Sequence, residues 1–362
     1  MEEKRFVYWF EELGEEHNDI VGKKCANLGQ MMRLGMKVPP GFAISIDLYK
    51  EFLRVTGLDK RLERYVMGLG DLKNVGIRVF EDISTNIREC IEGQDLPESI
   101  AKLISSYYEE LCERTQTPEL PVSVRSAGTQ SRPGMFETYL NVKGVEDVLN
   151  KVKKVWASSF TTRAVAFRVN KGLPLLGDEL GVAVVKLVNA RCSGICFTVD
   201  PVTGDTSKII LEANWGLGEG VVSGAESVDG FLIDKEDLRP LKAHIGKKLK
   251  CVVNLNKGAE WIDVPDHMQT IPCLSTEEAI EIASIARFVE QRLGCPQDME
   301  WAIDKDIGFP ESLFWLQTRP AKAAKQKDKT TSEKLAEKIT STFLELDLSK
   351  AKEALKAINF RF

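Results

Sequence analysis

The sequence predicts an α+β protein built as two lobes. In the first half the hydrophobic residues mainly follow helical spacing, whereas from residue 181 onward they form short strand-like runs separated by turns. The chain has 362 residues, of which 43% are hydrophobic, and this exceeds one domain of ordinary size. We therefore expect an N-terminal lobe over residues 1–190, a C-terminal lobe over 191–322, and a linker with a helical tail over 323–362.

The first hundred residues alternate glycine or proline turns with short elements. Residues 20–35 read as a glycine turn followed by a helix that ends at Gly35. After a Pro-Pro-Gly turn we expect a strand at 42–45 and then a helix capped by Ser45 or Asp47. Residues 50–117 are predicted to be mainly helical, most clearly in PESIAKLISSYYEELCER, where a Pro-Glu start precedes apolar residues at helical spacing.

The stretch VSVRSAGTQSRPGMFETYLNV, residues 122–142, predicts strand, loop and strand. Val122 and Val124 alternate with small residues, and we place Arg125 at the end of the first strand. Strand-like residues return at 139–142. The loop between them consists mostly of small and hydroxylated residues, so it either turns the chain or binds an anion.

After residue 144 the sequence predicts helices first and then mainly strands. Residues 145–171 are predicted helical, and short β-like runs follow in GVAVVKLVN, GICFTVDP, KIILEAN, GFLIDK, CVVNL and EWIDVP. A helix over 276–294 precedes a strand hairpin over 298–320. After a linker at 321–334, apolar residues at helical spacing predict two helices, which either pack on the chain's own body or dock onto another chain.

Composition narrows the classes of function. The formal net charge is −5 and the sequence pI is about 5.6, which argues against a general nucleic-acid binder. No apolar run approaches the length of a membrane span, and the acidic N-terminus does not resemble a signal peptide. The eight cysteines are then expected to be free buried thiols, and we expect a cytoplasmic location with neither membrane nor nucleic acid as partner.

Familiar catalytic signatures are absent from the sequence. VGKKCAN lacks Walker A spacing, GLGEG is not a dinucleotide fingerprint, and neither G-x-S-x-G nor H-E-x-x-H occurs. The three histidines, His17, His244 and His267, sit in no obvious motif. Histidine catalysis within this chain is therefore not expected.

Basic residues in the first half could bind phosphate. Lys24 lies near the start of a predicted helix, where the helix N-terminus favours anions, although a solvated pair with Lys23 is the simpler interpretation of that lysine alone. Arg125 precedes Ser126, Gly128, Thr129 and Gly134, a setting in which a guanidinium and backbone N–H groups could approach phosphate oxygens. An ordinary hairpin loop with an arginine ion pair is an equal alternative.

Acidic residues near the end of the body could bind a metal ion. Asp298 and Glu300 are two apart on one predicted strand, and Gln317 and Arg319 are two apart on its partner, so each pair shares a face. Two carboxylates, an amide and an arginine suit Mg²⁺ with phosphate. The alternative is a cross-strand salt bridge; we favour the metal because Trp301 and Trp315 anchor the opposite faces of a covered sheet.

Six segments, in order, resemble the nucleotide-binding domain of the dikinases, the family of phosphoenolpyruvate synthase, pyruvate phosphate dikinase and rifampicin phosphotransferase. They are VGKKCANLGQM…GMKVPPGFAIS, VSVRSAGTQSRPGMFETYLNV, VWASSFTTRAVAFRV, SGICFTVDPVTGD, EANWGLGEGVVSG and DMEWAID…LQTRP. The resemblance spans roughly residues 5–322. It implies an ATP-grasp fold, with ATP held between two lobes.

The resemblance also implies roles for individual residues. Lys24, Arg125 and Arg319 would contact ATP phosphates and act in catalysis, and Gly134 and Thr138 would belong to the phosphate-covering loop. Backbone groups around Lys186 to Val188 could bind adenine, and Glu212 would lie near the nucleotide. Asp298, Glu300 and Gln317 would hold Mg²⁺, so ATP and Mg²⁺ are the expected cofactors.

Three features depart from the family pattern. Lys23 replaces the second glycine of a Gly-Gly pair, Val185 stands where a glutamine usually lies along adenine, and the gap between Glu300 and Gln317 is longer. Family members continue into a swivelling domain with a phosphorylated histidine, whereas this chain ends at residue 362, about where that domain would begin. We therefore expect the chain to bind ATP but not to complete a dikinase cycle alone.

The resemblance thus predicts an ATP-binding subunit of a split dikinase-type phosphotransferase. It would cleave ATP to AMP and pass the β-phosphate to a histidine on a partner subunit, for onward transfer to phenol, pyruvate or a similar acceptor, an organisation similar to phenylphosphate synthase. Two alternatives stay open. One is a nucleotide-binding regulatory or scaffold subunit without turnover, and the other is an independent ATP-grasp ligase that would release ADP.

Overall fold

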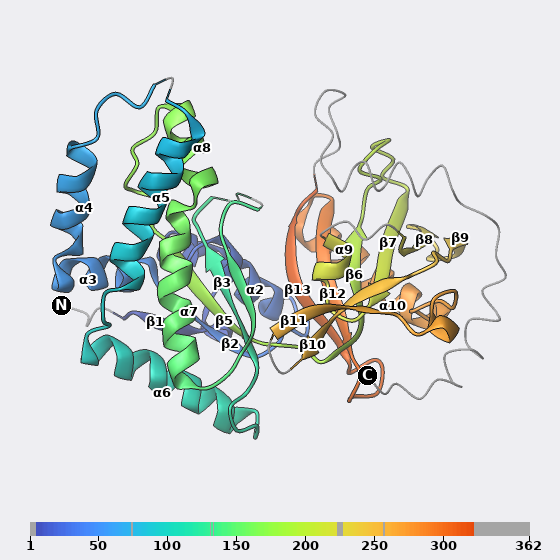
Figure 1. Cartoon of the computed structure of the whole chain (residues 1–362). Helices are drawn as coiled ribbons and strands as arrows, with labels where there is room; N and C mark the ends of the chain where they lie inside the picture. The colour runs from blue at the N-terminus through green and yellow to red at the C-terminus, as the bar shows by residue number, and fades with distance from the viewer. Residues whose placement is uncertain are drawn as a thin grey trace. The chain divides into compact units, whose positions relative to one another are not determined.

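The protein is described by a computed structural model that covers residues 5–321 except 74, 131, 133, 223–226, 256 and 257 (Figure 1). It divides into two compact units. The first joins Met1–Arg33 to Pro40–Leu187, and the second joins Leu34–Pro39 to Val188–Phe362. Each unit contains helices and β-sheet, so the prediction of a mixed α+β fold is confirmed. The ATP-grasp assignment stays a prediction, and the predicted tail over 323–362 lies outside the described residues.

The first unit is built on a five-stranded antiparallel sheet. Its strands follow the order β1-β2-β5-β3-β4. Their bounds are Val7–Trp9 for β1, Gly41–Ile44 for β2, Val122–Ala127 for β3, Thr138–Val142 for β4 and Gly181–Lys186 for β5. The predicted strand at 42–45 and the predicted strand-loop-strand of 122–142 are therefore both present. Strand β3 extends past Arg125 to Ala127, so placing this arginine at the strand's end was wrong.

Helices supply most of the first unit's core. They are α1 (Asn18–Val21), α2 (Lys23–Arg33), α3 (Ile46–Thr56), α4 (Leu58–Met67), α5 (Ile77–Glu92), α6 (Glu98–Arg114), α7 (Val145–Ala157) and α8 (Thr162–Lys171). Ser45 caps α3, because its hydroxyl accepts a hydrogen bond from the backbone N–H of Leu48. The ring of Trp156 stacks on Phe52, with centroids 5.2 Å apart, which packs α7 against α3 within one continuous apolar cluster.

The second unit is built on a six-stranded antiparallel sheet. Its strands follow the order β13-β12-β6-β7-β8-β9 (Figure 1). Their bounds are Ala190–Phe197 for β6, Lys208–Trp215 for β7, Asp229–Asp234 for β8, Pro240–His244 for β9, Gln297–Asp304 for β12 and Leu313–Pro320 for β13. A separate hairpin pairs β10 (Lys250–Leu255) with β11 (Gly258–Asp263). The sequence pattern predicted these strands except β9.

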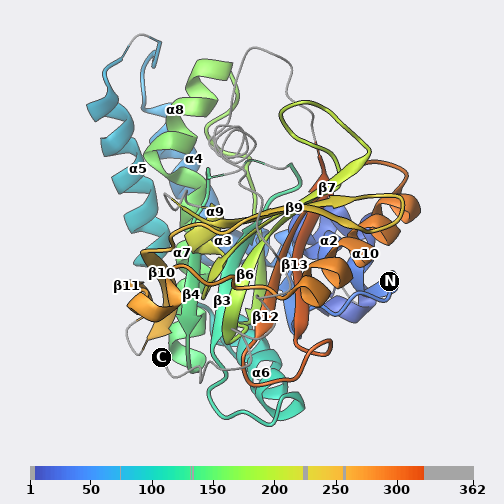
Figure 2. The same ribbon diagram turned by 90° about the vertical axis from the view of Figure 1, so that its right-hand side faces the viewer.

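Two helices pack on the six-stranded sheet. Helix α10 (Thr276–Leu293) contacts β6, β7, β8 and β12 through small and aliphatic side chains (Figure 2). Its N-terminus is closed by a reciprocal pair in which Ser275 and Glu278 each accept a backbone N–H of the other. The short helix α9 (Glu219–Val222) contacts β6 and β7, and its Val221 joins an apolar cluster with Ile195 and Phe197. Among the described helices, none is both long and apolar enough to cross a membrane.

Candidate functional site

Lys24 lies in the first turn of a helix, as the sequence predicted. Helix α2 begins at Lys23, directly after Gly22, whose φ of +81° favours glycine. A Cβ at Gly22 would also overlap the backbone carbonyl of Ala127, so only glycine allows this approach of the helix start to β3. The backbone N–H of Lys23 donates to the carbonyl of Gly128 at 2.9 Å. The helix start that carries Lys24 is therefore fixed beside the beginning of the predicted phosphate loop.

Arg125 and Thr138 lie directly opposite each other in the first unit's sheet. Arg125 of β3 is the register partner of Thr138 of β4 on one side and of Ala183 of β5 on the other. Thr138 is exposed, whereas the guanidinium Nε of Arg125 is buried. Two of the predicted phosphate-binding residues are therefore brought to one place by strand pairing, at the point where β3 and β4 open into the loop.

The loop between β3 and β4 is attached to helices on both sides. Gly134 has a φ of +66°, and its carbonyl accepts a hydrogen bond from the guanidinium of Arg163 in α8. The hydroxyl of Thr161 donates to the carbonyl of Met135 at 3.1 Å. At the far end of the loop, the carboxylate of Glu137 lies 2.8 Å from the guanidinium of Arg88 in α5. These contacts join residues 26 to 49 positions apart, and no local sequence pattern predicted them.

The segment predicted to meet adenine crosses the division between the units. Lys186 is the last residue of β5, and its backbone N–H donates to the carbonyl of Pro40 at 2.8 Å. Val188 belongs to the second unit, where it packs with Ala302 and Phe314. Val185 is buried in β5, between Gly41 and Ser123 of the neighbouring strands. The predicted contact with adenine stays a prediction.

The four predicted metal- and phosphate-binding residues of the second unit form two cross-strand pairs. Asp298 and Glu300 of β12 are the register partners of Arg319 and Gln317 of β13. The Nε of Arg319 donates to the carboxylate of Asp298 at 2.7 Å. The amide nitrogen of Gln317 donates to the carboxylate of Glu300 at 3.2 Å. The predicted hairpin and the shared face are confirmed, and the cross-strand salt bridge that was the alternative interpretation is also present.

Glu212 lies in the same row of the sheet. Glu212 of β7 pairs with Ile195 of β6, and Ile195 pairs in turn with Glu300. The side chain of Glu212 is fully buried, and neither carboxylate oxygen has a hydrogen-bond partner among the described residues. Burial, reinforced by the charge of Asp298, raises the pKa of Glu212 from 4.5 to about 8. A buried carboxyl without a partner costs stability, which indicates a group kept for binding.

The electrostatics of Asp298 reflect two opposing effects. Burial raises the pKa of Asp298, and the guanidinium of Arg319 counteracts part of that rise. Glu300, two residues away on the same strand, adds a second negative charge that also raises the pKa of Asp298. Carboxylates held this close repel each other, and a divalent cation between them would relieve that repulsion.

The oxygen donors on β12 and β13 fit Mg²⁺ bound together with phosphate. The described residues hold no group of three or more His, Cys, Asp or Glu side chains that would form a metal site unaided. Magnesium, however, is usually held by one or two carboxylates plus substrate phosphates and water. Asp298, Glu300 and the amide oxygen of Gln317 supply such a set, and Glu212, without a hydrogen-bond partner among the described residues, lies in the row of Glu300.

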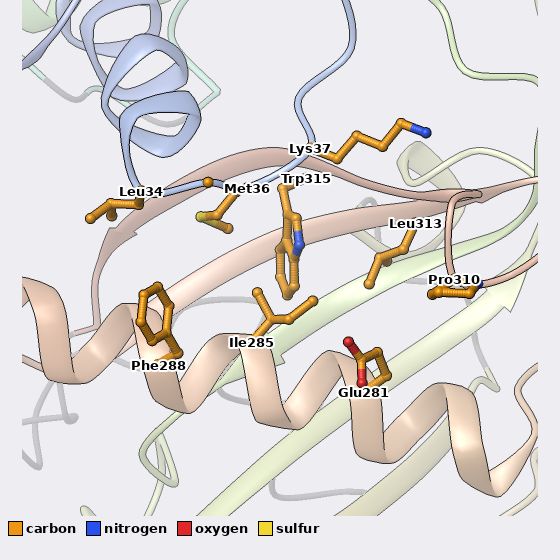
Figure 3. A pocket seen from close by; sticks show the side chains of 10 residues that line it. Leu34, Met36, Lys37, Glu281, Ile285, Phe288, Pro310, Leu313 and Trp315 are labelled. Atoms are coloured by element: carbon orange, nitrogen blue, oxygen red, sulfur yellow. The ribbon is translucent and has the colours of Figure 1, made fainter.

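A separate apolar cavity of about 220 Å³ lies in the second unit (Figure 3). The side chains of Met36, Ile285, Phe288 and Trp315 point into it from the 34–37 segment, α10 and β13. Glu281 at its edge supplies a carboxylate. None of the predicted site residues lines this cavity, so it is distinct from the row that contains Glu212 and Glu300.

Comparison with known proteins gives consistent matches. Residues 18–339 match the family described as pyruvate phosphate dikinase, AMP/ATP-binding domain. The chain is 36% identical to a probable phosphoenolpyruvate synthase of Methanocaldococcus jannaschii over 92% of its own length and 28% of that protein. It is also 36% identical to a probable phosphoenolpyruvate synthase of Staphylothermus marinus, over 92% of this chain and 43% of that protein.

A further relative is the phosphoenolpyruvate synthase of Pyrococcus furiosus, which is 33% identical over 89% of this chain and 44% of that protein. The chain therefore spans less than half the length of these relatives. What they share with it is the nucleotide-binding portion, which is the portion that carries the residues described above.

Proposed function

The chain belongs to the pyruvate phosphate dikinase family through its AMP/ATP-binding domain, and on this premise we propose that it is the ATP-binding component of a dikinase-type phosphotransferase. It cleaves ATP to AMP and delivers the β-phosphate, first as a pyrophosphoryl group, to a histidine on a partner subunit. The partner carries the phosphate onward to a small acceptor such as pyruvate or a phenol, as the name of the relatives suggests for pyruvate.

The observation that carries this proposal is the register of β12 and β13. It sets Asp298 opposite Arg319 and Glu300 opposite Gln317, so that carboxylates, an amide and a guanidinium are presented together. A cation-binding pair beside a phosphate-binding arginine is what a nucleoside triphosphate with Mg²⁺ requires. A purely structural salt bridge would not need the second pair or the buried carboxyl of Glu212.

In the reaction we propose, an imidazole nitrogen of the partner's histidine attacks the β-phosphorus of ATP. A nitrogen–phosphorus bond forms, the bond between the β-phosphorus and the α–β bridging oxygen breaks, and AMP leaves. The histidine then carries a pyrophosphoryl group, and attack of water on the γ-phosphorus releases inorganic phosphate and leaves the β-phosphate on the histidine. Lys24 and Arg125 of the first unit and Arg319 of the second bind the phosphates and neutralise the charge that develops on them. Gly134 and Thr138 hold the loop over the phosphates, and the backbone around Lys186 to Val188 binds adenine.

Asp298, Glu300 and Gln317 would hold Mg²⁺. When bound, the ion neutralises phosphate charge and orients the phosphate chain. The chain's own residues complete this environment: Arg319 orients Asp298 and favours its ionised form against the effect of burial, and Gln317 orients Glu300. Glu212, whose pKa is about 8, loses its proton more readily once a cation binds in the same row.

The histidines of this chain support an acceptor elsewhere. The chain has three histidines, and the Nδ1 of His17 accepts a hydrogen bond from the backbone N–H of Gly14 at 3.1 Å within a short helical turn. His244 ends β9, and His267 lies in the turn Asp266–Met268. None of them neighbours the pairs on β12 and β13 in the strand register.

The proposal is tested by following labelled phosphate. The chain is incubated with Mg²⁺ and ATP labelled at the β-phosphorus, with and without a candidate partner that carries a phosphorylatable histidine domain, sought first among the products of neighbouring genes. We expect AMP to form and the label to appear on a histidine of that partner. Label on this chain in the absence of a partner would refute the proposed route.

Nucleotide products separate the alternatives. ADP as the product would indicate an independent ATP-grasp ligase, and tight ATP binding without AMP or ADP would indicate a regulatory or scaffold subunit. The variant Arg125→Ala should fold and bind partner but form AMP at least tenfold more slowly, the scale expected when one phosphate-stabilising charge is lost. The exposed Arg54→Ala, which loses an ion pair to Glu51 on α3, serves as the matched control.

A further inference from the structure

We propose that Asp178 is a positioning residue that locks the phosphate loop of the first unit in place before nucleotide binds. The inference rests on the proposed function for its consequence, but its structural part does not. Asp178 lies in the connection between α8 and β5, and it contacts the loop at Arg132. We call this contact the Asp178 latch.

The latch is fixed firmly at its base. One carboxylate oxygen of Asp178 accepts a hydrogen bond from the Nε of Arg168 at 2.9 Å, and the Nη2 of the same arginine lies 2.7 Å away. The side chain of Arg168 is 2% exposed. Its Nη1 also donates to the carbonyls of Ser159 and Leu175, at 2.9 and 3.0 Å. A buried guanidinium bound on three sides leaves Asp178 little freedom to move.

The loop is held by the same oxygen of the Asp178 carboxylate. Arg132 donates through its Nη1 to the oxygen of Asp178 that Arg168 also binds. The guanidinium of Arg132 further lies over the ring of Phe167 in α8, 5.2 Å from its centroid. The side chain of Arg132 is 15% exposed. Two arginines therefore share one carboxylate, one from the helix and one from the loop.

The loop needs such a latch because strand pairing does not extend into it. The register of β3 with β4 ends at Arg125 and Thr138, and beyond Arg125 strand β3 pairs only with β5, through Ser126 and Ala127, among the residues that the structure describes. Arg163 and Thr161 of the α8 region donate to the backbone carbonyls of Gly134 and Met135, and at the far end of the loop Glu137 forms an ion pair with Arg88 of α5. The Asp178 latch is the ion pair that holds the middle of the loop, at Arg132.

The consequence is pre-organisation of the loop. If the loop is already ordered, binding of phosphate does not bear the entropy cost of ordering it. Removal of the latch should therefore weaken nucleotide binding even though Asp178 and Arg132 need not touch the nucleotide. Loss of a ligand would also weaken binding, but it would not increase amide exchange of the loop in the nucleotide-free chain, and this difference distinguishes the two roles.

Hydrogen–deuterium exchange of the full chain without nucleotide tests the latch directly. In Arg132→Gln we expect amides within 128–139 to exchange about tenfold faster, the scale of losing one partly buried charge pair. Arg132→Lys, which keeps the charge, should recover part of the protection. Asp178→Asn should also speed exchange of the loop amides. Because that variant leaves the buried Arg168 without its carboxylate and could fail to fold, Arg132→Gln is the main test.

The matched control is Glu179→Gln. Glu179 is the neighbour of Asp178 in the same connection, but its carboxylate pairs with Lys50 of α3, at 3.0 Å, instead of with the loop. In Glu179→Gln the backbone amides of 128–139 should exchange at the wild-type rate. If Arg132→Gln folds and its loop amides exchange within twofold of the wild-type rate, the latch does not exist.

Titration with Mg²⁺ and ATP then tests the consequence. Arg132→Gln should bind roughly fivefold more weakly than the wild type, with Glu179→Gln unchanged. Faster exchange with unaltered ATP affinity would overturn the positioning role. A wild-type chain that fails to bind ATP at all would instead overturn the proposed function, and it would leave the exchange result standing.

Discussion

Glu212 and Glu300 share one row of the six-stranded sheet, separated by Ile195 of β6. One is buried without a hydrogen-bond partner among the described residues, and the other accepts the amide of Gln317. Three neighbouring strands, β7, β6 and β12, thus bring together carboxylates that are 88 residues apart in the sequence. This relationship motivates the first two predictions.

Replacement of Glu212 by glutamine should alter how stability depends on pH. The pKa of Glu212 is about 8 in the folded chain against an ordinary value of 4.5, so the folded state holds a proton that the unfolded state releases. The stability contributed by that proton is complete below about pH 4.5 and is lost as pH rises toward 8. The stability of Glu212→Gln relative to the wild type should therefore increase from pH 5 to pH 8.5. The largest possible increase in the free energy of unfolding is on the order of 1.4 kcal/mol for each unit by which the two pKa values differ.

Urea midpoints measured at four pH values across this range provide the test. Glu110→Gln on α6 is the control, because the side chain of Glu110 is 47% exposed and pairs with Arg114 at the surface. Parallel curves for Glu212→Gln and the wild type would show that the buried carboxyl does not hold its proton.

Asp298→Asn should weaken Mg²⁺ binding more than it lowers the stability of the fold. It removes one charged oxygen ligand and leaves Arg319 without its ion-pair partner, but the side chain of Arg319 is 36% exposed and so remains solvated. We expect the Mg²⁺ concentration for half-maximal ATP binding to rise at least tenfold, since even outer-shell changes cost roughly 10–100-fold. Isothermal titration with Mg²⁺ at fixed ATP measures it.

Asp205→Asn is the control for that experiment. Asp205 is also an acidic residue of the second unit that pairs with a basic side chain, Lys208, at 2.8 Å. It lies before β7, away from the β12–β13 hairpin in sequence and strand register. Equal Mg²⁺ dependence of the two variants would remove Asp298 from the metal site.

Gly22→Ala should destabilise the first unit more than Gly35→Ala destabilises the second. Both glycines have a φ of +81°, where an L side chain is strained. Gly22 also has a ψ of 157°, in a region that is essentially limited to glycine. At Gly22 a Cβ would also overlap the carbonyl of Ala127, whereas at Gly35 it would meet nothing within 4 Å. The additional cost at Gly22 should be about 1–3 kcal/mol, measured as a difference in urea midpoints.

Equal effects of these two substitutions would show that the start of α2 is not packed against β3. That packing matters for the site, because α2 carries Lys24 and β3 carries Arg125. Loss of ATP binding in Gly22→Ala at temperatures where the chain is folded would link the packing to the proposed phosphate site.

Lys248→Met should be strongly destabilising. Lys248 and Asp229 are both fully buried, with their charged atoms 2.5 Å apart, and Asp229 also accepts the backbone N–H groups of Gly246 and Cys273. Removing the lysine leaves a buried carboxylate without its cation, which costs about 3–5 kcal/mol.

Lys151→Met on α7 provides the comparison for Lys248→Met. Lys151 pairs with Asp147 one turn away, where the aspartate is 41% exposed, and such pairs contribute about 0.5 kcal/mol or less. Similar shifts in thermal midpoint for the two variants would contradict the buried ion pair.

Local sequence patterns predicted elements where one physical signal dominated. Ser45 predicted a helix start because a hydroxyl before an apolar helix caps free N–H groups, and the hairpin carrying Asp298 and Arg319 followed from period-two alternation. Strand β9 was missed, because Pro240 opens it and its side chains are mostly half-exposed, so it lacks a buried face that would reveal a strand.

The sequence proposed residues for the candidate site but not the contacts that support them. Residue patterns pointed to Arg125 and Glu300 and the family resemblance to Glu212, and their roles stay predictions, yet nothing near Asp178 in the sequence indicates that it binds Arg132 and Arg168. Such contacts arise when tertiary packing brings distant charges together, and the sequence pattern carries no trace of them. The burial of the Glu212 carboxylate without a hydrogen-bond partner among the described residues likewise depends on tertiary packing.

The assignment of Leu34–Pro39 to the second unit has a practical consequence for anyone who dissects the gene. The chain passes from one unit to the other at three points, so neither unit is a contiguous cassette that a single cut could release. The carbonyl of Lys37 accepts the backbone N–H of Trp315 on the edge strand β13, at 2.8 Å. A fragment beginning at residue 188 would lose that cover, leaving an unpaired, aromatic-bearing edge prone to self-association.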